Sequence, residues 1–410
     1  MNPLNILIVH NKYKIPGGED TVVEAESKLL REAGHKVIPY IRSNDELDSM
    51  GIIGKLSALL HADYSKRVYK DVTALIKREK IDIVHVHNTQ LIITPSVYYA
   101  AVDAGIPVVQ TVHNFRLVCP GALCLRDGAI CTECIDNTKG LSNAKSHACY
   151  RGSKLQTHAA IRILTKNRKR EIYKKINYIC LTEFNKNLLL SANKLGNEIF
   201  DPDKFFIKPN FADAPNTIIP YQNRKREFVC ISRLSTEKGV DLLVNAYAKY
   251  ESLCNNEQLS PFTLSIYGSG PLEEQIKKQI SETGSTNIIL KGQKSHSEVL
   301  WHLSQVSALL FPTTWFEGFP MVLAEAKACG TPVITADIGN AGNLVEDSRT
   351  GIKYSSIDQL PELLLQWTKD ESSIIHTQMS EASISEFESH YTPSANLSIL
   401  EQIYTKVLSK

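Results

Sequence analysis

The sequence lacks any hydrophobic run that could cross a membrane and any charge excess that would attract a polyanion. A transmembrane helix needs about 18 consecutive apolar residues, and the 410-residue sequence contains no such run. Lysine and arginine total 46 against 44 aspartate and glutamate, so nucleic acid is not an expected partner. The first residues also lack the basic region and apolar core of an export signal. We therefore expect a protein of the cytoplasm.

Low-complexity tracts and short internal repeats are absent as well. Hydrophobic residues make up 43% of the sequence and charged residues 22%, which is enough apolar material for large cores and argues against disorder. The length predicts two or three domains. In a reducing compartment the nine cysteines are expected to be thiols or metal ligands before they are disulfides.

Short β-branched runs alternate with longer helical patterns such as residues 20–33 and 64–80. In the first half we predict strands at residues 5–10, 35–40, 81–88, 107–114, 178–183 and 205–210. In the second half we predict strands at residues 227–234, 262–268, 287–292, 308–313 and 332–338. Continuous apolar strands separated by helices are typical of parallel sheets covered on both faces. The predicted fold class is therefore α/β, with doubly wound parallel sheets.

A proline-containing, charged stretch without periodicity, residues 208–227, predicts a linker between two such domains. We place the domains at residues 1–210 and 225–385, with a C-terminal helix at 386–410 that packs back on the first domain. Ligands of these sheets bind beyond the carboxyl ends of the strands. Two sheets facing each other would enclose a cleft for a substrate.

The stretch TTWFEGFPMVLAEAKACG, residues 313–330, carries two carboxylates in otherwise apolar sequence. Pro320 suits the first turn of a helix and Gly330 the position after its end, which puts Glu317 in the preceding loop and Glu325 within the helix. The first amides of this helix and its dipole can bind an anion or a hydroxyl group. These amides belong to Gly318, Phe319, Met321 and Val322. Two carboxylates suit the vicinal hydroxyls of a sugar or a ribose, and a capped helix with one exposed glutamate is the alternative.

A second signal is ISRLSTEKGVDLL, residues 231–243, where a strand ends, Arg233 and Lys238 follow, and a helix begins. Two cations at a strand-to-helix turn suit a diphosphate, with arginine acting as a fork and lysine as a point charge. Solvated surface charge is the alternative. Gly268, in IYGSGP, marks a loop at the same expected edge, and a plain turn is equally consistent with it.

Near the start, Gly17 and Gly18 precede a helix with an acidic first turn. Their amides could touch a phosphate or a substrate hydroxyl, and a tight turn is the alternative. Histidines gather at strand ends. We interpret His85 and His87 as core or rim residues. We single out His113, because it ends a strand at the edge where ligands bind.

Taken together, SRLSTEKG, YGSGP and FEGFPMVLAEAKACGTPVI resemble the retaining, nucleotide-sugar-dependent glycosyltransferases of family 4 (group 1), which have the GT-B fold of two Rossmann-like domains. In the first half, GGED, IVHVHN and HNFRLVCPG are similar to a bacterial branch that builds surface polysaccharides, including lipopolysaccharide and capsule. The resemblance covers essentially the whole chain. One departure is NFAD, residues 210–213, where the family often has Asn-Gly-Val-Asp.

The resemblance implies a role for each matching residue. Glu317 and the amides after it would hold the sugar hydroxyls and the diphosphate of the donor, and Glu325 would bind the ribose. Arg233 and Lys238 would stabilise the leaving nucleotide diphosphate as its charge develops. His113 would lie beside the donor sugar. The loop beside the donor phosphate and the acceptor would be that of Gly17 and Gly18.

The activity that the resemblance implies is transfer of a hexose-type sugar from a UDP- or GDP-sugar to a glycan acceptor that is lipid-linked, with retention of the anomeric configuration. No cofactor or divalent metal is expected, because cationic side chains and helix dipoles stabilise the leaving group in this fold. The sequence offers no clear carboxylate nucleophile, so we favour attack from the face that the nucleotide leaves. The alternatives are a nucleotide-sugar epimerase of the same fold and a silent paralogue that only binds nucleotide.

Five cysteines lie close together in the sequence: Cys119, Cys124, Cys131, Cys134 and Cys149. Cys131 and Cys134 have the CxxC spacing of metal ligands, so four of the five could hold a structural zinc, with Cys119 and Cys149 as the other two ligands. The outer spacings match no standard zinc module. Reduced, partly buried thiols are the alternative.

The segment from Arg151 to Lys175 carries nine lysines or arginines against one acid. Apolar residues at helical spacing within it predict a basic amphipathic helix that docks on an anionic membrane surface, at the inner face of the cell membrane. A solvated helix face is the alternative. The docking residues would be Arg168, Lys169, Arg170, Lys174 and Lys175.

Overall fold

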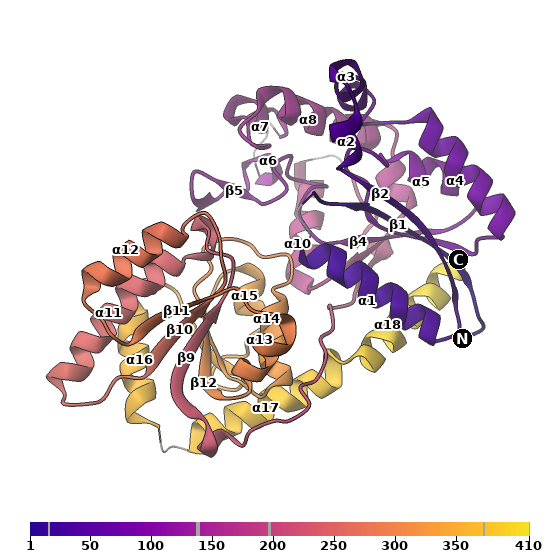
Figure 1. Cartoon of the computed structure of the whole chain (residues 1–410). Coiled ribbons are helices and arrows are strands. Elements are labelled where there is room, and N and C mark those ends of the chain that lie inside the picture. The colour runs from indigo at the N-terminus through magenta and orange to yellow at the C-terminus, as the bar shows by residue number, and fades with distance from the viewer. Residues whose placement is uncertain (15–16, 137–139, 196–197, 372–373, 410) are drawn as a thin grey trace. The chain divides into compact units, whose positions relative to one another are not determined.

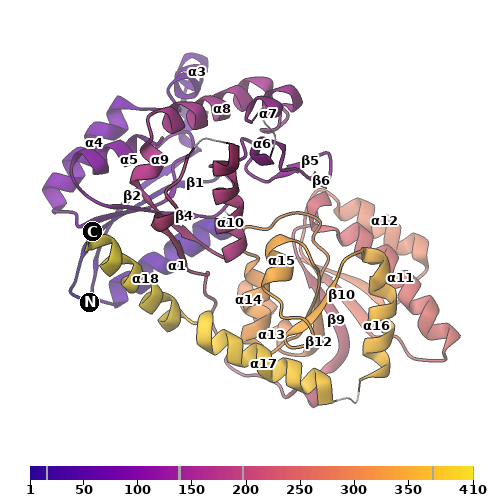
Figure 2. The same cartoon turned by 180° about the vertical axis from the view of Figure 1, so that it is seen from behind.

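The computed structural model describes residues 1–14, 17–136, 140–195, 198–371 and 374–409. It divides into two compact units (Figures 1 and 2). The first comprises Met1–Arg126, Cys131–Asn210 and Asn396–Lys410, and the second comprises Asp127–Ile130 and Phe211–Ala395. Each unit is built on a six-stranded parallel sheet, which confirms the predicted α/β class with two parallel-sheet domains.

The sheet of the first unit has the strand order β2–β1–β3–β4–β7–β8. Its strands are β1 (Asn5–Lys12), β2 (Lys36–Ser43), β3 (Ile83–Asn88), β4 (Val108–Val112), β7 (Asn177–Cys180) and β8 (Phe205–Ile207). Every residue of β3, β4 and β7 is buried, as continuous apolar runs predict for a sheet covered on both faces. The strand order reverses between β1 and β3, so a ligand of this sheet is expected at the carboxyl ends of those two strands.

The helices of the first unit cover its sheet on both faces (Figures 1 and 2). They are α1 (Gly18–Glu32), α2 (Glu46–Ser49), α3 (Ile52–Leu60), α4 (Lys66–Glu79), α5 (Ser96–Asp103), α6 (Glu133–Asp136), α7 (Ser142–His147), α8 (Lys154–Lys169), α9 (Ile172–Lys175), α10 (Glu183–Ser191) and α18 (Pro393–Leu408), the last from Asn396 onward. In α4, Ser65 caps the amide of Val68 at 3.3 Å, and Val68, Val72 and Ile76 form the buried stripe. In α18, Leu400 and Tyr404 enter the apolar core beside β1.

The sheet of the second unit has the order β11–β10–β9–β12–β13–β14, which is the 3-2-1-4-5-6 order of Rossmann-like sheets. Its strands are β9 (Lys225–Ile231), β10 (Thr263–Tyr267), β11 (Ile288–Gly292), β12 (Val306–Phe311), β13 (Val333–Ala336) and β14 (Gly351–Tyr354). Its helices are α11 (Val240–Asn256), α12 (Glu273–Thr283), α13 (His296–Leu303), α14 (Met321–Ala328), α15 (Gly339–Asn343), α16 (Leu360–Lys369) and α17 (Ile374–His390). The strand order reverses between β9 and β12, where Rossmann-like sheets bind their ligands.

Three features differ from the sequence-based expectation. The two-stranded sheet of β5 (Leu125–Arg126) and β6 (Ala129–Ile130) was not predicted, because strands of two residues carry no periodic pattern. Strand β14 was not predicted, because it is a four-residue edge strand whose middle residues, Ile352 and Lys353, are only half-buried, so it lacks an apolar run. The segment from Arg151 to Lys175 is not one helix but two, α8 and α9, separated at Glu171, whose φ of 55° is left-handed. No described helix combines the length and the apolar character that a membrane crossing requires.

Candidate functional site

Three loops follow β9, β10 and β12 at the point where the second sheet changes strand order, and glycines hold them together. Gly239 has φ +65°, and a Cβ there would lie 2.2 Å from the carbonyl oxygen of Pro312. Gly268 has φ +136°, and a Cβ there would lie 1.9 Å from the carbonyl oxygen of Ser232. Only glycine fits either contact. The predicted edge position of Gly268 therefore serves close packing of one loop against another.

Glu317 is buried in the loop after β12, and three donors converge on its Oε1 atom. Lys238 Nζ lies at 2.7 Å, Trp315 Nε1 at 2.8 Å and Thr313 Oγ1 at 3.0 Å. The Lys238 ammonium also stands 5.4 Å from the centre of the Trp315 ring. The carboxylate is thus held in one orientation before any ligand binds, and its charge is compensated by Lys238.

The loop of Glu317 leads directly into helix α14, whose position agrees with the sequence-based prediction. Pro320 precedes the helix in an extended conformation, and the side-chain amide of Asn340 donates to the carbonyls of Glu317 and Gly318, at 2.7 Å each. Phe319, which packs with Met321 and Val322 on the neighbouring apolar core, anchors the turn. The first helical amides, those of Met321 and Val322, have no acceptor within the helix and remain suited to an anion or a hydroxyl.

Glu325 lies within α14, two turns after Glu317, and is buried. Its Oε1 atom is 3.1 Å from Nε2 of His296, at the start of α13. The hydrogen bond to Glu325 raises the pKa of His296, whose side chain is 56% exposed. An exposed partner of this kind can leave, so Glu325 can exchange His296 for the hydroxyls of a ligand.

The two cations predicted for a diphosphate differ in their surroundings. Lys238, in the short helix η4 (Thr236–Lys238), is only 19% exposed and forms the ion pair with Glu317. Arg233 is exposed, and its side chain pairs with none of the described residues. Solvated surface charge therefore describes Arg233 in this state but does not describe Lys238.

In the first unit, the start of α1 has the geometry of the alternative interpretation, a tight helix entry. The amide of Gly17 donates to Oδ2 of Asp20 at 2.9 Å, so it is already occupied. A Cβ at Gly17 or Gly18 would meet no atom within 4 Å, and neither has a positive φ, so packing does not require glycine there. A contact between this loop and a phosphate stays a prediction.

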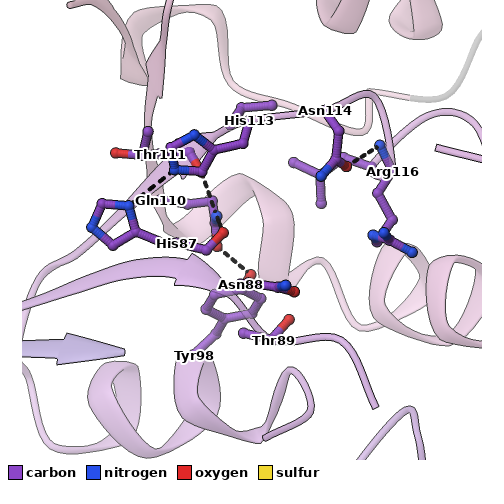
Figure 3. A pocket seen from close by; sticks show the side chains of 11 residues that line it. His87, Asn88, Thr89, Tyr98, Gln110, Thr111, His113, Asn114 and Arg116 are labelled. Carbon is purple, nitrogen blue, oxygen red and sulfur yellow. Dashed lines mark hydrogen bonds between the residues drawn. The ribbon is translucent and has the colours of Figure 1, made fainter. Parts of the chain in front are cut away.

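His113 directly follows β4 and borders a small cavity of about 50 Å³ (Figure 3). Its Nε2 atom is 3.0 Å from Nδ1 of His87, and the two rings are stacked with centroids 5.3 Å apart. Burial lowers the pKa of His113 well below its usual range, with His87 adding to the effect, so the ring is neutral. His85 and His87 are buried residues, as predicted.

Two buried charged residues near His87 were not identified from the sequence. Glu26 of α1 and Lys208, which follows β8, form an ion pair of 2.7 Å between Oε2 and Nζ. A signal was present, because Glu26 falls on the apolar face of α1 with Val22 and Leu30. Within the described residues, Glu26, His85 and His87 have ligand atoms within 4.8 Å of one another, a spacing that a metal ion could use. The Lys208 ammonium already supplies the positive charge there, so the group fits an internal ion pair better than a metal.

The five clustered cysteines are free thiols that influence one another. A hydrogen bond from Cys124 lowers the pKa of Cys119 to about 6, whereas burial raises the pKa of Cys134 to about 12, with Cys119, Cys149 and Cys131 contributing. No three of these sulfur atoms lie within 4.8 Å of one another in the described chain. The thiols are therefore neighbours without a preformed tetrahedral site, and a structural zinc stays a prediction.

The basic segment does not present the amphipathic surface that was predicted. Its apolar residues Ala159, Ile163 and Leu164 are buried against the first unit, whereas Leu155 is exposed by itself. Arg168, one of the predicted docking residues, donates to the carbonyl of Leu117 at 2.9 Å. The fold therefore uses the apolar stripe of this segment for its own core, and docking of its basic residues on an anionic membrane stays a prediction.

Comparison with known proteins adds two family models and several relatives. Residues 16–161 match the model described as Glycosyltransferase Family 4, and residues 218–385 match the model of glycosyl transferases group 1. The poly(glycerol-phosphate) alpha-glucosyltransferase of Bacillus subtilis is 30% identical over 199 residues, which is 47% of this chain and 28% of that protein. The chain spans between a quarter and about a third of the length of the first curated relatives that it matches.

Solved structures with the same fold extend over the whole chain. A glycosyltransferase from Rickettsia africae has a TM-score of 0.69 at 17% identity and full coverage of both chains. Anabaena HepE in complex with UDP has a TM-score of 0.66 at 15% identity, covering 99% of this chain and 100% of its own. At this identity the likeness concerns the fold, which is GT-B. The two family models, the relatives and the fold lead to one conclusion: the chain belongs to a family of GT-B glycosyltransferases.

Proposed function

We propose that this protein transfers a hexose-type sugar from a nucleotide-diphosphate sugar to a glycan acceptor that is lipid-linked, with retention of the anomeric configuration. The observation that carries the proposal is the Glu317 carboxylate, fixed by Lys238, Trp315 and Thr313 in front of the first amides of α14. This arrangement combines an acceptor for sugar hydroxyls with a cation and helix amides for a diphosphate. The strand-order reversal beside it is where Rossmann-like sheets bind nucleotides.

In the proposed complex, Glu317 accepts hydrogen bonds from the donor sugar, and Glu325 exchanges His296 for the ribose hydroxyls. Arg233, which is exposed and unpaired among the described residues, closes on the diphosphate together with Lys238. Both cations then offset the charge that develops on the leaving nucleotide. No divalent metal or other cofactor is part of this proposal, and full activity in the presence of a chelator is its expected consequence.

The chemical step is proposed to be attack of the acceptor hydroxyl from the face that the nucleotide leaves. The bond to the anomeric carbon forms as the bond to the diphosphate oxygen breaks, and that oxygen takes the proton of the acceptor. No carboxylate nucleophile is assigned, because three donors hold Glu317 as a hydroxyl acceptor. The protein contributes orientation and electrostatic stabilisation.

The choice of donor and acceptor rests on the relatives. Anabaena HepE is described in complex with UDP, which supports UDP as the nucleotide, with GDP as the other candidate. The Bacillus subtilis relative is named for glucosyl transfer to poly(glycerol-phosphate), which supports a surface polymer as the acceptor. Location in the cytoplasm stays a prediction.

Two conservative variants test the division of labour between the glutamates. Glu325→Gln is expected to weaken binding of bare UDP about 10- to 100-fold, because a hydrogen bond to a charged acceptor contributes ~1.5–3 kcal/mol. Glu317→Gln is expected to leave UDP affinity nearly intact and to lower turnover of the full donor, since it orients the reacting sugar. Calorimetry and initial rates make the two measurements, and equal loss of UDP affinity in both variants would contradict the assignment.

The identity of the product separates this proposal from its rivals. Proton coupling in NMR should report the same anomeric configuration in product and donor, and an inverted linkage would overturn retention. Interconversion of donor sugars without an acceptor would favour an epimerase. Binding of the donor without any turnover would favour a silent paralogue.

The structural zinc is tested separately by elemental analysis of the purified protein. A content near one equivalent, with destabilisation by Cys131→Ser, would support a zinc held by Cys119, Cys131, Cys134 and Cys149. A content below about a tenth of an equivalent would leave the five cysteines as reduced thiols.

A further inference from the structure

A row of buried polar side chains runs through the first unit from Lys208 to His113. Glu26 of α1 links the two ends, since its Oε2 lies 2.7 Å from Lys208 Nζ and its Oε1 lies 3.4 Å from Nε2 of His87. His87 Nδ1 in turn lies 3.0 Å from His113 Nε2 (Figure 3). Glu26 and His87 are buried, so water is a poor substitute for any of these partners. Each proton position in the row is therefore constrained by its neighbours.

Glu26 and Lys208 set the charge at one end of this row. Burial opposes ionisation of Glu26, but Lys208, His85 and His87 outweigh it and hold the pKa of Glu26 well below its usual range. Glu26 is therefore a carboxylate, and a carboxylate only accepts hydrogen bonds. The Lys208 ammonium already neutralises it at 2.7 Å, and Asn396 Oδ1 takes a second Lys208 hydrogen bond at 3.1 Å. The Glu26–Lys208 pair is therefore neutral as a whole.

His85 is not the hydrogen-bond partner of Glu26. Its Nδ1 lies 2.6 Å from the hydroxyl of Tyr404, and its Nε2 lies 2.7 Å from the hydroxyl of Thr111. Both of its nitrogens thus have nearer partners than Glu26 Oε1, at 3.4 Å. Glu26 Oε1 and His87 Nε2 are buried atoms that lie 3.4 Å apart, and neither has a hydrogen-bond partner of good geometry in the described structure. Because the two nitrogens of His85 are hydrogen-bonded to hydroxyl groups, we pair Glu26 Oε1 with His87 Nε2.

The proton positions follow from this pairing. Because Glu26 only accepts, His87 must carry its proton on Nε2, and a neutral imidazole then has a bare Nδ1. The short contact of 3.0 Å to His113 consequently requires a proton on His113 Nε2. His113 is left with a bare Nδ1, which can accept a hydrogen bond from a ligand, because the hydrogen bond of this ring to His87 uses Nε2.

We propose that Glu26 and His87 are positioning residues that hold His113 as its Nε2–H tautomer, so that His113 Nδ1 reads a hydroxyl group of the substrate and rejects an anionic oxygen. A hydroxyl can donate to the bare nitrogen, whereas a phosphate or carboxylate oxygen would meet it lone pair to lone pair. The hydroxyl-reading part rests on the proposed function, because it takes the ligand to be a sugar. The tautomer itself does not depend on that function.

The Glu26→Gln variant provides a directed test, because Lys208 dictates how the new amide lies. The amide oxygen must face the Lys208 ammonium, so the NH₂ group faces His87 Nε2 and donates to it. The protons of the row then shift: His87 becomes Nδ1–H and donates to His113 Nε2, and His113 becomes Nδ1–H. A residue with a merely structural role would alter stability without moving these protons.

The measurement is two-bond ¹H–¹⁵N NMR of protein labelled at histidine, at pH 8, where an ordinary imidazole is neutral. His113→Gln and His87→Gln assign the signals among the 12 histidines. We expect bare Nδ1 atoms at both positions in the wild type and protonated Nδ1 atoms at both in Glu26→Gln. His10→Gln is the matched control, since its ring lies 6.4 Å from His87 but outside the row. His113 should keep its wild-type tautomer in that control.

Two outcomes would overturn the proposal: a protonated His113 Nδ1 in the wild type, or an unchanged His113 in a folded Glu26→Gln variant. If that variant does not fold, the wild-type spectrum still decides. Kinetics test the hydroxyl-reading part, with a lower kcat and an unchanged affinity for bare UDP expected in Glu26→Gln. A correct tautomer switch without any transferase activity in the wild type would refute the proposed function and leave the row intact.

Discussion

The two units each contain a glutamate–lysine pair with the same 2.7 Å separation, yet the pairs differ in what surrounds them. Glu26 and Lys208 in the first unit are almost fully buried, with side-chain exposures of 0% and 1%. Glu317 and Lys238 in the second unit lie at a sheet edge with exposures of 7% and 19%. A buried pair that loses a partner leaves an uncompensated charge in a low-dielectric core. A pair at an edge can exchange its partner for a ligand or for water.

The difference in burial indicates that the Glu26–Lys208 pair cannot exchange partners, whereas the Glu317–Lys238 pair can. Lys208 is buried beside Glu26 and also donates a hydrogen bond to Oδ1 of Asn396. Lys238 contacts Glu317 and the Trp315 ring and is partly exposed. Thr313 and Trp315 each donate to Glu317 as well, so they can keep its carboxylate in place if Lys238 moves to a ligand. The same pair of chemical groups thus serves internal order in one unit, and in the other we propose that it binds a ligand.

The strongest way to break the buried pair is Lys208→Met, which leaves Glu26 charged and unpaired. We expect a loss of about 3–5 kcal/mol in the free energy of unfolding. Lys36→Met is the matched control, because the Lys36–Glu79 pair is exposed and worth at most ~1 kcal/mol. Denaturant titration measures both, and similar losses in the two variants would contradict the comparison.

Acid should also act on the first unit. Burial lowers the pKa of His85 to about 3, with His87 and Lys208 adding to the effect and Glu26 opposing it. The unfolded chain binds protons from pH ~6.5 downward where folded His85 does not, so stability falls as the pH drops from there towards 3. The depressed pKa of Glu26 adds a further loss below pH ~4.5. We expect a total of a few kcal/mol, and unfolding midpoints between pH 7 and 4 would measure it.

Breaking the edge pair should affect binding more than folding. Lys238→Met is expected to weaken binding of bare UDP about 10- to 100-fold, since a charge-assisted hydrogen bond contributes ~1.5–3 kcal/mol. The unfolding free energy should change by less than ~1 kcal/mol, because Glu317 keeps two donors and Lys238 is partly solvated. Calorimetry and denaturant titration give the two values. If Lys238→Met lost more free energy of unfolding than free energy of UDP binding, the Glu317–Lys238 pair would be structural, like the buried pair.

The smallest effect is expected at the pair of Glu325 with His296, whose imidazole is largely exposed. The hydrogen bond to Glu325 raises the pKa of His296, with the Glu325 charge and Asp213 contributing further. The stabilising contact is therefore complete below pH ~6.5 and is lost as the pH rises through the raised pKa. Release of Glu325 should then strengthen UDP binding by at most a few fold. His296→Gln should abolish this pH dependence, and an unchanged profile in the variant would count against the exchange.

Local sequence was sufficient to predict most strands and the helix after Glu317. Apolar runs reveal β3, β4 and β12, and a proline before and a glycine after α14 mark its ends. The short edge strand β14 was not predicted, because too few of its residues are buried to give an apolar run. The basic segment illustrates a related point, since an apolar stripe at helical spacing does not reveal whether membrane or core will cover it.

The sequence by itself thus determined the α/β class, the loops at the carboxyl ends of the strands and the presence of Glu317 and Lys238 in them. Only the tertiary structure decided the partners. Glu26 and Lys208 are 182 residues apart in sequence, and Lys238 and Glu317 are 79 apart. Periodicity and turn signals report interactions between near neighbours in the chain. Ion pairs across a sheet depend on how distant elements pack, and their strength depends on the burial that this packing creates.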